Sequence, residues 1–324
     1  MIELRHVNKT FRVAKRNAGM KEALKALVFR EYTQVQALRD ISFSVADGEM
    51  VGYIGPNGAG KSSTIKVMSG ILTPDSGECC VDGLTPWKSR KQHVRNIGVV
   101  FGQRSQLWWD VPVIDSFELL RDIYSIPSSA YRRNVDELTE LLSLSELLRT
   151  PARQLSLGQR MRCEIAASLL HDPGILFLDE PTIGLHAVSK IAVRKFIKAR
   201  NRERKTTVIL TTHDMQDIEA LTERILLIGR GQILLDGSLS QLKQRNSRTK
   251  KLNISYSTGT FQPLEGVQLV AEFGGHAEFL IDTEVIGVSG AIQSLAQNIE
   301  ITDLSVEGAS AEELVVSLYK EFAI

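Results

Sequence analysis

The chain has 324 residues, of which 43% are hydrophobic and 24% are charged, and its net charge at pH 7 is +1. These values are typical of a folded globular protein, and the lack of a long basic tract gives no support to nucleic acid as the main partner. The three cysteines have neither the number of a disulfide framework nor the spacing of a zinc site, which favours a reducing cytosol. Because there is no signal-peptide pattern and no run of 18 apolar residues, we expect neither a leader nor a membrane-spanning helix.

The first functional motif in chain order is GPNGAGKS at residues 55–62, which fits the pattern G-x-x-x-x-G-K-[ST]. An apolar strand is predicted before it, over MVGYI, and a helix after it, as a phosphate-binding loop requires. The glycines allow backbone N–H groups to turn inward around an anion, and the helix start adds partial positive charge. Lys61 would reach the β- and γ-phosphates, and Ser62 would bind magnesium. The residues expected around the phosphates are Gly55, Pro56, Asn57, Gly58, Ala59, Gly60, Lys61, Ser62 and Ser63.

The second motif is ILFLDEPTIGLH at residues 175–186, an apolar run that ends in two acids and a proline. Such a run predicts a buried parallel strand, whose acidic end lies at the sheet edge where α/β folds bind ligands. From these residues alone, a helix cap before Pro181 is as good an explanation as a site. With a nucleotide in place, Asp179 would hold the magnesium ion and Glu180 would activate water as general base. This interpretation expects the two motif strands to lie side by side.

Between these motifs, RQLSLGQRMRCEIAASLLHDP resembles the signature sequence of ATP-binding cassette (ABC) proteins, with LSLGQ at residues 155–159. A helix with a buried stripe is expected to follow, because Met161, Ile165 and Leu169 recur every four residues. The resemblance implies that Ser156, Gly158 and Gln159 bind the ATP of an opposite protomer. Leu157 stands where many family members have glycine, and since it removes no backbone donor, we expect this binding to survive.

The resemblance also assigns residues outside the three motifs. Gln103 resembles the glutamine that touches magnesium and senses the membrane partner, and His213 resembles the histidine that contacts the γ-phosphate. Phe11 is expected to stack on adenine, with Tyr32 as its competitor. His186 stands where the family usually has aspartate, a change that would tune or weaken hydrolysis without removing the magnesium, base or phosphate groups.

The predicted fold class is α/β, a P-loop NTPase of the ABC type with a mixed sheet core and a helical signature subdomain, followed by a small α+β domain. We expect the ATPase domain at residues 1–245, with an insertion at 14–33 and the helical subdomain at 104–170. The insertion predicts a basic amphipathic helix that lies at a membrane, on a partner or on the cassette itself. Trp108 and Trp109 are either partner anchors or buried in the subdomain.

The polar run KQRNSRTKK predicts a linker, and residues 246–324 predict an accessory domain with several strands and two helices, the last capped by Ser310. No motif in this domain carries chemistry.

The resemblance implies an ATPase that uses ATP and Mg²⁺ and drives a membrane ABC transporter, with similarity to an exporter-type branch. It implies two cassettes per complex, a homodimer or a pair with a similar cassette, bound to separate permease subunits at the cytoplasmic face of the membrane. The alternatives are a soluble ABC ATPase without a transporter and an ATP-binding scaffold with weak hydrolysis. The chain has neither the second cassette nor the long heptad insertion that non-transport members carry.

Overall fold

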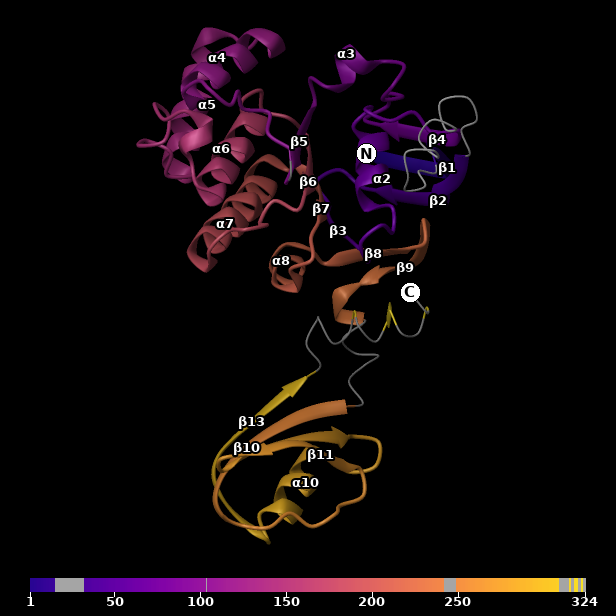
Figure 1. The fold of residues 1–324 in the computed structure, drawn as a ribbon, viewed down its shortest axis with the longest axis vertical. Coiled ribbons are helices and arrows are strands. Elements are labelled where there is room, and N and C mark those ends of the chain that lie inside the picture. The colour runs from indigo at the N-terminus through magenta and orange to yellow at the C-terminus, as the bar shows by residue number, and fades with distance from the viewer. Residues whose placement is uncertain are drawn as a thin grey trace, which may run out of the picture. The chain divides into compact units, whose positions relative to one another are not determined.

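The computed structural model describes residues 1–14, 32–102, 104–241 and 249–308, together with residues 315, 318, 319 and 322. The chain divides into two compact units, Met1–Asp236 and Gly237–Ile324 (Figure 1). Four predictions fall wholly or mainly outside the described residues: the inserted helix within 14–33, the glutamine at position 103, the domain boundary at 245/246, and the closing helix capped by Ser310. In the described part of the chain, no helix is long and apolar enough to cross a membrane.

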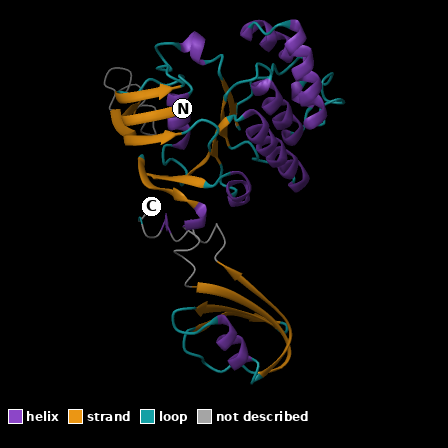
Figure 2. Ribbon diagram, turned by 180° about the vertical axis from the view of Figure 1, so that it is seen from behind, coloured by secondary structure: helices purple, strands orange, loops and turns teal. Residues whose placement is uncertain are grey.

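The first unit contains two sheets. A three-stranded antiparallel sheet has the order β2-β1-β4 and forms a layer of its own (Figure 2). Its strands are β1 (Ile2–Ala14), β2 (Tyr32–Val45) and β4 (Ser76–Val81). A six-stranded sheet has the order β5-β6-β7-β3-β8-β9, in which β5 to β8 run parallel. Its strands are β3 (Met50–Ile54), β5 (Ile97–Phe101), β6 (Ile175–Asp179), β7 (Thr207–Thr211), β8 (Arg224–Gly229) and β9 (Gln232–Ser238).

The strand order corrects one expectation from the sequence. The strand before the phosphate loop, β3, and the acidic strand, β6, are not neighbours, because β7 lies between them and pairs with both. Parallel pairing brings the carboxyl ends of all three strands to one edge. The phosphate loop and the two acids therefore lie at the same edge of the sheet, and they are separated by the width of β7.

Some helices of the first unit pack on strands of its sheets, and others pack on these helices to form a helical subdomain. The helices are α2 (Lys61–Met68), α3 (Arg90–His93), α4 (Val113–Tyr124), α5 (Ser128–Leu141), α6 (Leu157–Leu169), α7 (Ala187–Arg204) and α8 (Met215–Leu221), with a 3₁₀ turn at Ala152–Gln154. Helix α2 contacts strands of both sheets, and α6 contacts β5 and the helices α4 and α5. The predicted stripe of Met161, Ile165 and Leu169 is buried, which confirms the helical prediction for this segment.

Apolar residues of both sheets and of α2 form one core in the first unit. Tyr53 of β3, Ile65 and Met68 of α2, and Phe177 of β6 are fully buried in it. Burial of side chains of this size contributes roughly 1.5–3 kcal/mol each. This core fixes the start of α2, and with it the phosphate loop, against the central strands.

In its described part, the second unit has a four-stranded antiparallel sheet with the order β11-β12-β10-β13, and a helix lies against this sheet (Figure 2). Its elements are β10 (Thr249–Gly259), β11 (Val267–Phe273), β12 (His276–Asp282), α10 (Val288–Leu295) and β13 (Ile299–Gly308). Alternate residues of β12 are buried, as a strand with one covered face requires. These elements match the strands and the helix predicted for this segment, and their core includes Leu252, Phe279 and Leu295.

Candidate nucleotide-binding site

The phosphate loop connects the end of β3 to the start of α2. Gly60 is the N-cap residue of α2 and has φ +114, a backbone conformation that a side chain would strain. A Cβ at this position would also lie 2.7 Å from the backbone oxygen of Ala37 in β2. Glycine at this position therefore lets the loop turn close to β2 and directs the free N–H groups of the first helical turn into the pocket.

Lys61 is the first residue of α2, and its side chain contacts the phosphate loop. Its side chain is buried, and its Nζ atom donates to the backbone oxygens of Gly55 at 2.6 Å and Pro56 at 3.1 Å. Burial lowers the pKa of the Lys61 amino group, and the nearby carboxylates of Glu180 and Asp179 oppose this shift. The ammonium group is thus held at the loop, close to acids that favour its charged form.

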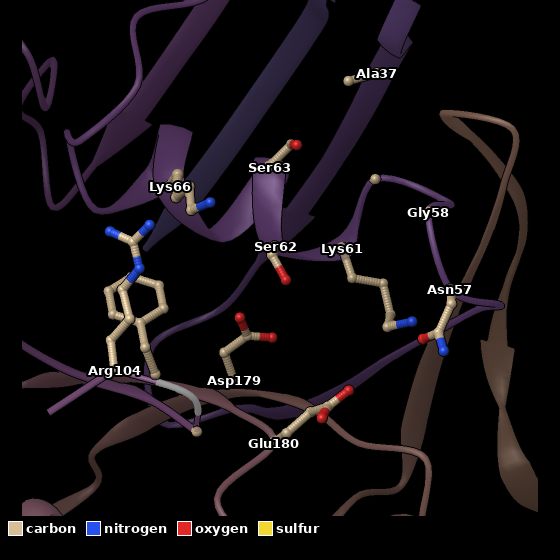
Figure 3. A pocket seen from close by; sticks show the side chains of 13 residues that line it. Ala37, Asn57, Gly58, Lys61, Ser62, Ser63, Lys66, Arg104, Asp179 and Glu180 are labelled. Atoms are coloured by element: carbon tan, nitrogen blue, oxygen red, sulfur yellow. The ribbon is translucent and has the colours of Figure 1, made fainter. Parts of the chain in front are cut away.

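Asp179 ends β6 and faces Ser62 across the pocket. Figure 3 shows the Ser62 hydroxyl and the Asp179 carboxylate directed toward each other. One Asp179 oxygen accepts a hydrogen bond of 2.5 Å from the Thr211 hydroxyl at the end of β7. This contact orients the carboxylate across the intervening strand. The sequence did not identify Thr211, although a polar residue at the carboxyl end of an apolar strand was the available signal.

Glu180 and His213 are in contact, with 2.7 Å between His213 Nε2 and Glu180 Oε1. Glu180 has φ +56, a left-handed conformation that is uncommon for a side chain of this kind, and its N–H donates to the Thr211 backbone oxygen at 2.9 Å. Strained backbone of this kind occurs where the surrounding structure imposes it. The turn after β6 therefore aims the Glu180 carboxylate at the loop that carries His213.

A cavity of about 380 Å³ collects most of these groups (Figure 3). Its lining residues are Ala37, Asn57, Gly58, Gly60, Lys61, Ser62, Ser63, Lys66, Phe101, Gly102, Arg104, Asp179 and Glu180. Predicted phosphate-loop residues and both predicted acids are thus brought together. Ala37, Lys66 and Arg104 are lining residues that the sequence did not single out.

The donor groups of this cavity fit a magnesium ion that arrives with a nucleotide. Mg²⁺ prefers oxygen ligands and is usually held by one or two protein groups plus substrate phosphates and water. The Ser62 hydroxyl and the Asp179 carboxylate are such groups. Among the described residues, no cluster of three or more acidic, histidine or cysteine side chains has the geometry to hold a metal alone. The arrangement suits an ion held jointly by protein and phosphates.

A buried network links the two loops that carry Glu180 and His213. Asp217 of α8 is fully buried and accepts hydrogen bonds from the hydroxyls of Thr182 and Thr212, the latter at 3.0 Å. Arg194 of α7 donates to its other oxygen at 2.5 Å. A buried carboxylate needs such donors, and here they come from both loops. Asp217 was not predicted, since its partners come together only in the fold.

The signature segment begins α6 and lies outside this cavity. Ser156 is the N-cap residue, and its hydroxyl accepts from the Gln159 N–H at 3.2 Å while the Gln159 side chain accepts from the Ser156 N–H at 2.8 Å. Leu157 packs on Gly184, where an added Cβ would lie 2.0 Å from Leu157 Cδ2. The leucine that departs from the family pattern therefore joins the signature segment to the loop that follows β6.

Other predicted residues occupy the surroundings of the site. Phe11 lies on β1 and is not a lining residue of the cavity, so its stacking role stays a prediction. His186 is the exposed N-cap residue of α7 and makes no side-chain capping bond. Trp108 and Trp109 are more than half exposed, at 59% and 51%, which excludes burial within the helical subdomain.

The chain is similar to known ABC transporter proteins. The ABC transporter family pattern matches residues 38–183. The chain is 30% identical over 219 residues to the ABC transporter ATP-binding protein NatA of Bacillus subtilis (strain 168), covering 68% of this chain and 88% of NatA. It is 28% identical over 298 residues to the linearmycin resistance ATP-binding protein LnrL of the same organism, covering 89% of this chain and 95% of LnrL.

An importer protein and a solved structure are also similar. The methionine import ATP-binding protein MetN of Vibrio vulnificus (strain YJ016) is 31% identical over 246 residues, which cover 75% of this chain and 66% of MetN. The dimeric structure of the ATP-binding cassette MJ0796 bound to ADP and Pi has a TM-score of 0.62 and 26% sequence identity, covering 74% of this chain and 99% of that one. The predicted fold class is therefore confirmed for the part of the chain that these matches cover.

Proposed function

This chain belongs to the family of ABC transporter ATP-binding proteins, and from that premise we propose that it is the ATP-hydrolysing subunit of an exporter with separate membrane subunits. The observation that carries the proposal is the single cavity in which the phosphate loop meets Asp179 and Glu180. A binding scaffold would need the loop alone. The presence of both acids, with His213 paired to Glu180, favours hydrolysis over the scaffold alternative.

Each group at the cavity has a role in this proposal. Lys61 and the loop N–H groups bind the β- and γ-phosphates. Ser62 and Asp179 would hold Mg²⁺, which neutralises phosphate charge when bound. Glu180 accepts a proton from the attacking water, and His213 orients Glu180 and contacts the γ-phosphate. The predicted contributions of Gln103 to magnesium and of Phe11 to adenine complete the assignment.

We assign Ser156, Gly158 and Gln159 to the ATP site of a second cassette. Two observations support this assignment. These residues lie outside the cavity that contains Lys61, and the similar cassette MJ0796 forms a dimer in its ADP- and Pi-bound structure. The partner is a second copy of this chain or a similar cassette. ATP would then be enclosed between the phosphate loop of one cassette and the signature segment of the other.

Export and permease binding rest on two further observations. The similarity to LnrL, a resistance protein by name, covers 89% of this chain and so extends into the second unit, Gly237–Ile324. Trp108 and Trp109 are exposed in the helical subdomain, where they are available to a partner at the cytoplasmic face of a membrane. The transporter subunit is expected to be a polytopic membrane protein.

The test uses the purified full chain and phosphate release from ATP in the presence of Mg²⁺. The parent should hydrolyse ATP, and Lys61→Ala should abolish hydrolysis. If a neighbouring gene encodes a polytopic membrane protein, co-expression of the chain with that protein should recover both in one membrane complex. A parent that binds no ATP would refute the ATPase assignment, and a chain that stays free of this membrane protein would refute the transporter subunit assignment.

A further inference from the structure

Arg104 is a cation of the nucleotide cavity that no motif explains. It lines the cavity together with Lys66 and Phe101, and its N–H donates to the Phe101 backbone oxygen at 3.0 Å. Figure 3 shows the guanidinium group of Arg104 and the amino group of Lys66 at the same end of the pocket. Both side chains carry positive charge and line one cavity, so an anion bound there would be attracted by both. The cavity therefore favours an anionic ligand at the end that these two residues line.

The other charged lining residues have partners within the protein. Lys61 donates to loop carbonyls, Asp179 accepts from Thr211, and Glu180 is paired with His213. Within the described residues, the side chains of Arg104 and Lys66 have no hydrogen-bond or ion-pair partner. The unmatched charge of this cavity is therefore positive, and it lies beside the first turns of α2, where Ser63 also lines the pocket.

A buried carboxylate holds the segment that follows Arg104. Glu164 of α6 is 4% exposed, and its carboxylate accepts from the Ser105 hydroxyl and from the Gln106 N–H at 3.1 Å. The Gln106 side chain donates to the Glu164 backbone oxygen at 3.0 Å. Burial raises the pKa of Glu164, and the hydrogen bonds from Ser105 and Gln106 oppose that shift. Three hydrogen bonds thus tie residues 105 and 106 to the helix that begins at the signature segment.

We infer that Arg104 is a further phosphate-binding residue of this ATPase, and that Glu164 is the positioning residue that places it in the cavity. This inference rests on the proposed function, because ATP is the anion that Arg104 would contact. A guanidinium group suits the purpose, since its planar N–H groups match phosphate oxygens and stay charged at any physiological pH. The same contact would link nucleotide binding to α6, and so to the signature segment at its start.

The first experiment measures ATP affinity by calorimetry in the presence of EDTA, so that no hydrolysis occurs. Arg104→Ala should weaken ATP binding about 10- to 100-fold, the usual effect of losing a hydrogen bond to a charged group. Arg104→Lys should recover part of this loss because it keeps the charge. Arg132→Ala is the matched control, since Arg132 is an exposed arginine of α5 outside the cavity, and it should bind ATP like the parent.

The second experiment is a double-mutant cycle with Glu164. Glu164→Ala should weaken ATP binding, whereas the combination with Arg104→Ala should be no weaker than Arg104→Ala alone, because Glu164 acts through Arg104. Thermal unfolding checks that each variant is folded, and Glu164→Gln replaces Glu164→Ala in the cycle if the latter is not. Fully additive losses would contradict the positioning role. Parent-like ATP binding by Arg104→Ala would overturn the inference alone, while a parent that binds no ATP would overturn the proposed function as well.

Discussion

His213 Nε2 lies 2.7 Å from Glu180 Oε1, although the two residues are 33 positions apart in the sequence and follow different strands. The pair joins the turn after β6 to the loop after β7. Asp217 links the two loops, because its carboxylate accepts hydrogen bonds from the hydroxyls of Thr182 and Thr212. The proposed base therefore lies beside His213, and the hydrogen bonds of Asp217 to Thr182 and Thr212 link the two loops that carry this pair.

Glu180→Gln tests the base directly. The amide keeps the shape of the side chain but cannot accept a proton from water, so hydrolysis should fall about 10²- to 10⁴-fold. ATP binding should persist, because Lys61 and the loop N–H groups are unchanged. Phosphate release and nucleotide binding are measured on the same purified protein.

Glu118→Gln is the control for this change, since Glu118 is an exposed glutamate of α4 away from the cavity. Its turnover should equal that of the parent. Near-normal hydrolysis in Glu180→Gln would show that another group activates water.

Mixed dimers test whether sites are shared between two chains. A Lys61→Ala chain lacks the phosphate lysine, and a Ser156→Arg chain carries a bulky cation at the start of α6, so each should be inactive alone. In a mixed dimer, one site carries both changes and the other carries neither. Activity should return to about a quarter of the parent rate in an equal mixture, if chains pair at random and sites act independently.

The mixture is compared with each variant alone at the same total concentration, and circular dichroism verifies that both variants are folded. A mixture that hydrolyses no faster than its components would contradict the assignment of Ser156 to an opposite site.

His186→Asp tests the helix cap of α7. His186 occupies the N-cap position without a side-chain capping bond. Aspartate would accept hydrogen bonds from free N–H groups of the first turn and place negative charge at the helix start. The free energy of unfolding should rise by about 1 kcal/mol. Urea unfolding measures this change, with His186→Ala as a control that should give no gain.

The same variant tests the effect of the departure from the family pattern on hydrolysis. His186→Asp should hydrolyse ATP at least as fast as the parent, since aspartate is the usual family residue. A slower His186→Asp would show that histidine is the better residue in this chain.

His171 predicts a pH dependence of stability. Burial lowers its pKa from 6.5 to about 4, while its Nε2 atom lies 2.9 Å from the Ile97 backbone oxygen and its ring stacks on Tyr124 at 4.0 Å. Below pH 6.5 the unfolded chain binds a proton that the folded chain does not bind until about pH 4. The free energy of unfolding should therefore fall as the pH drops through this window, by up to about 3 kcal/mol from this group.

His171→Asn removes the titrating group, so its loss of stability between pH 6.5 and pH 4 should be smaller than that of the parent. Urea unfolding across this range measures the difference. Equal slopes for the parent and His171→Asn would show that His171 is protonated as readily in the folded chain as in the unfolded one.

The sequence by itself determined the features that depend on neighbouring residues. The phosphate loop and the acidic strand end each lie within one continuous segment, where spacing and turn chemistry specify the local structure. The strands and the helix of the second unit were predicted for the same reason, because alternation and turn residues act over a few positions. The buried stripe of Met161, Ile165 and Leu169 was also predicted from local sequence, because its spacing follows the period of a helix.

Only the tertiary structure decided which segments meet. The placement of β7 between β3 and β6 brought Thr211 to Asp179, and the packing of α6 brought Glu164 to the segment that carries Arg104. The pairing of Leu157 with Gly184 is also a contact between distant segments. A local pattern shows that a side chain must be buried or must find a hydrogen-bond partner, but the partner is chosen by how whole elements pack around a common core.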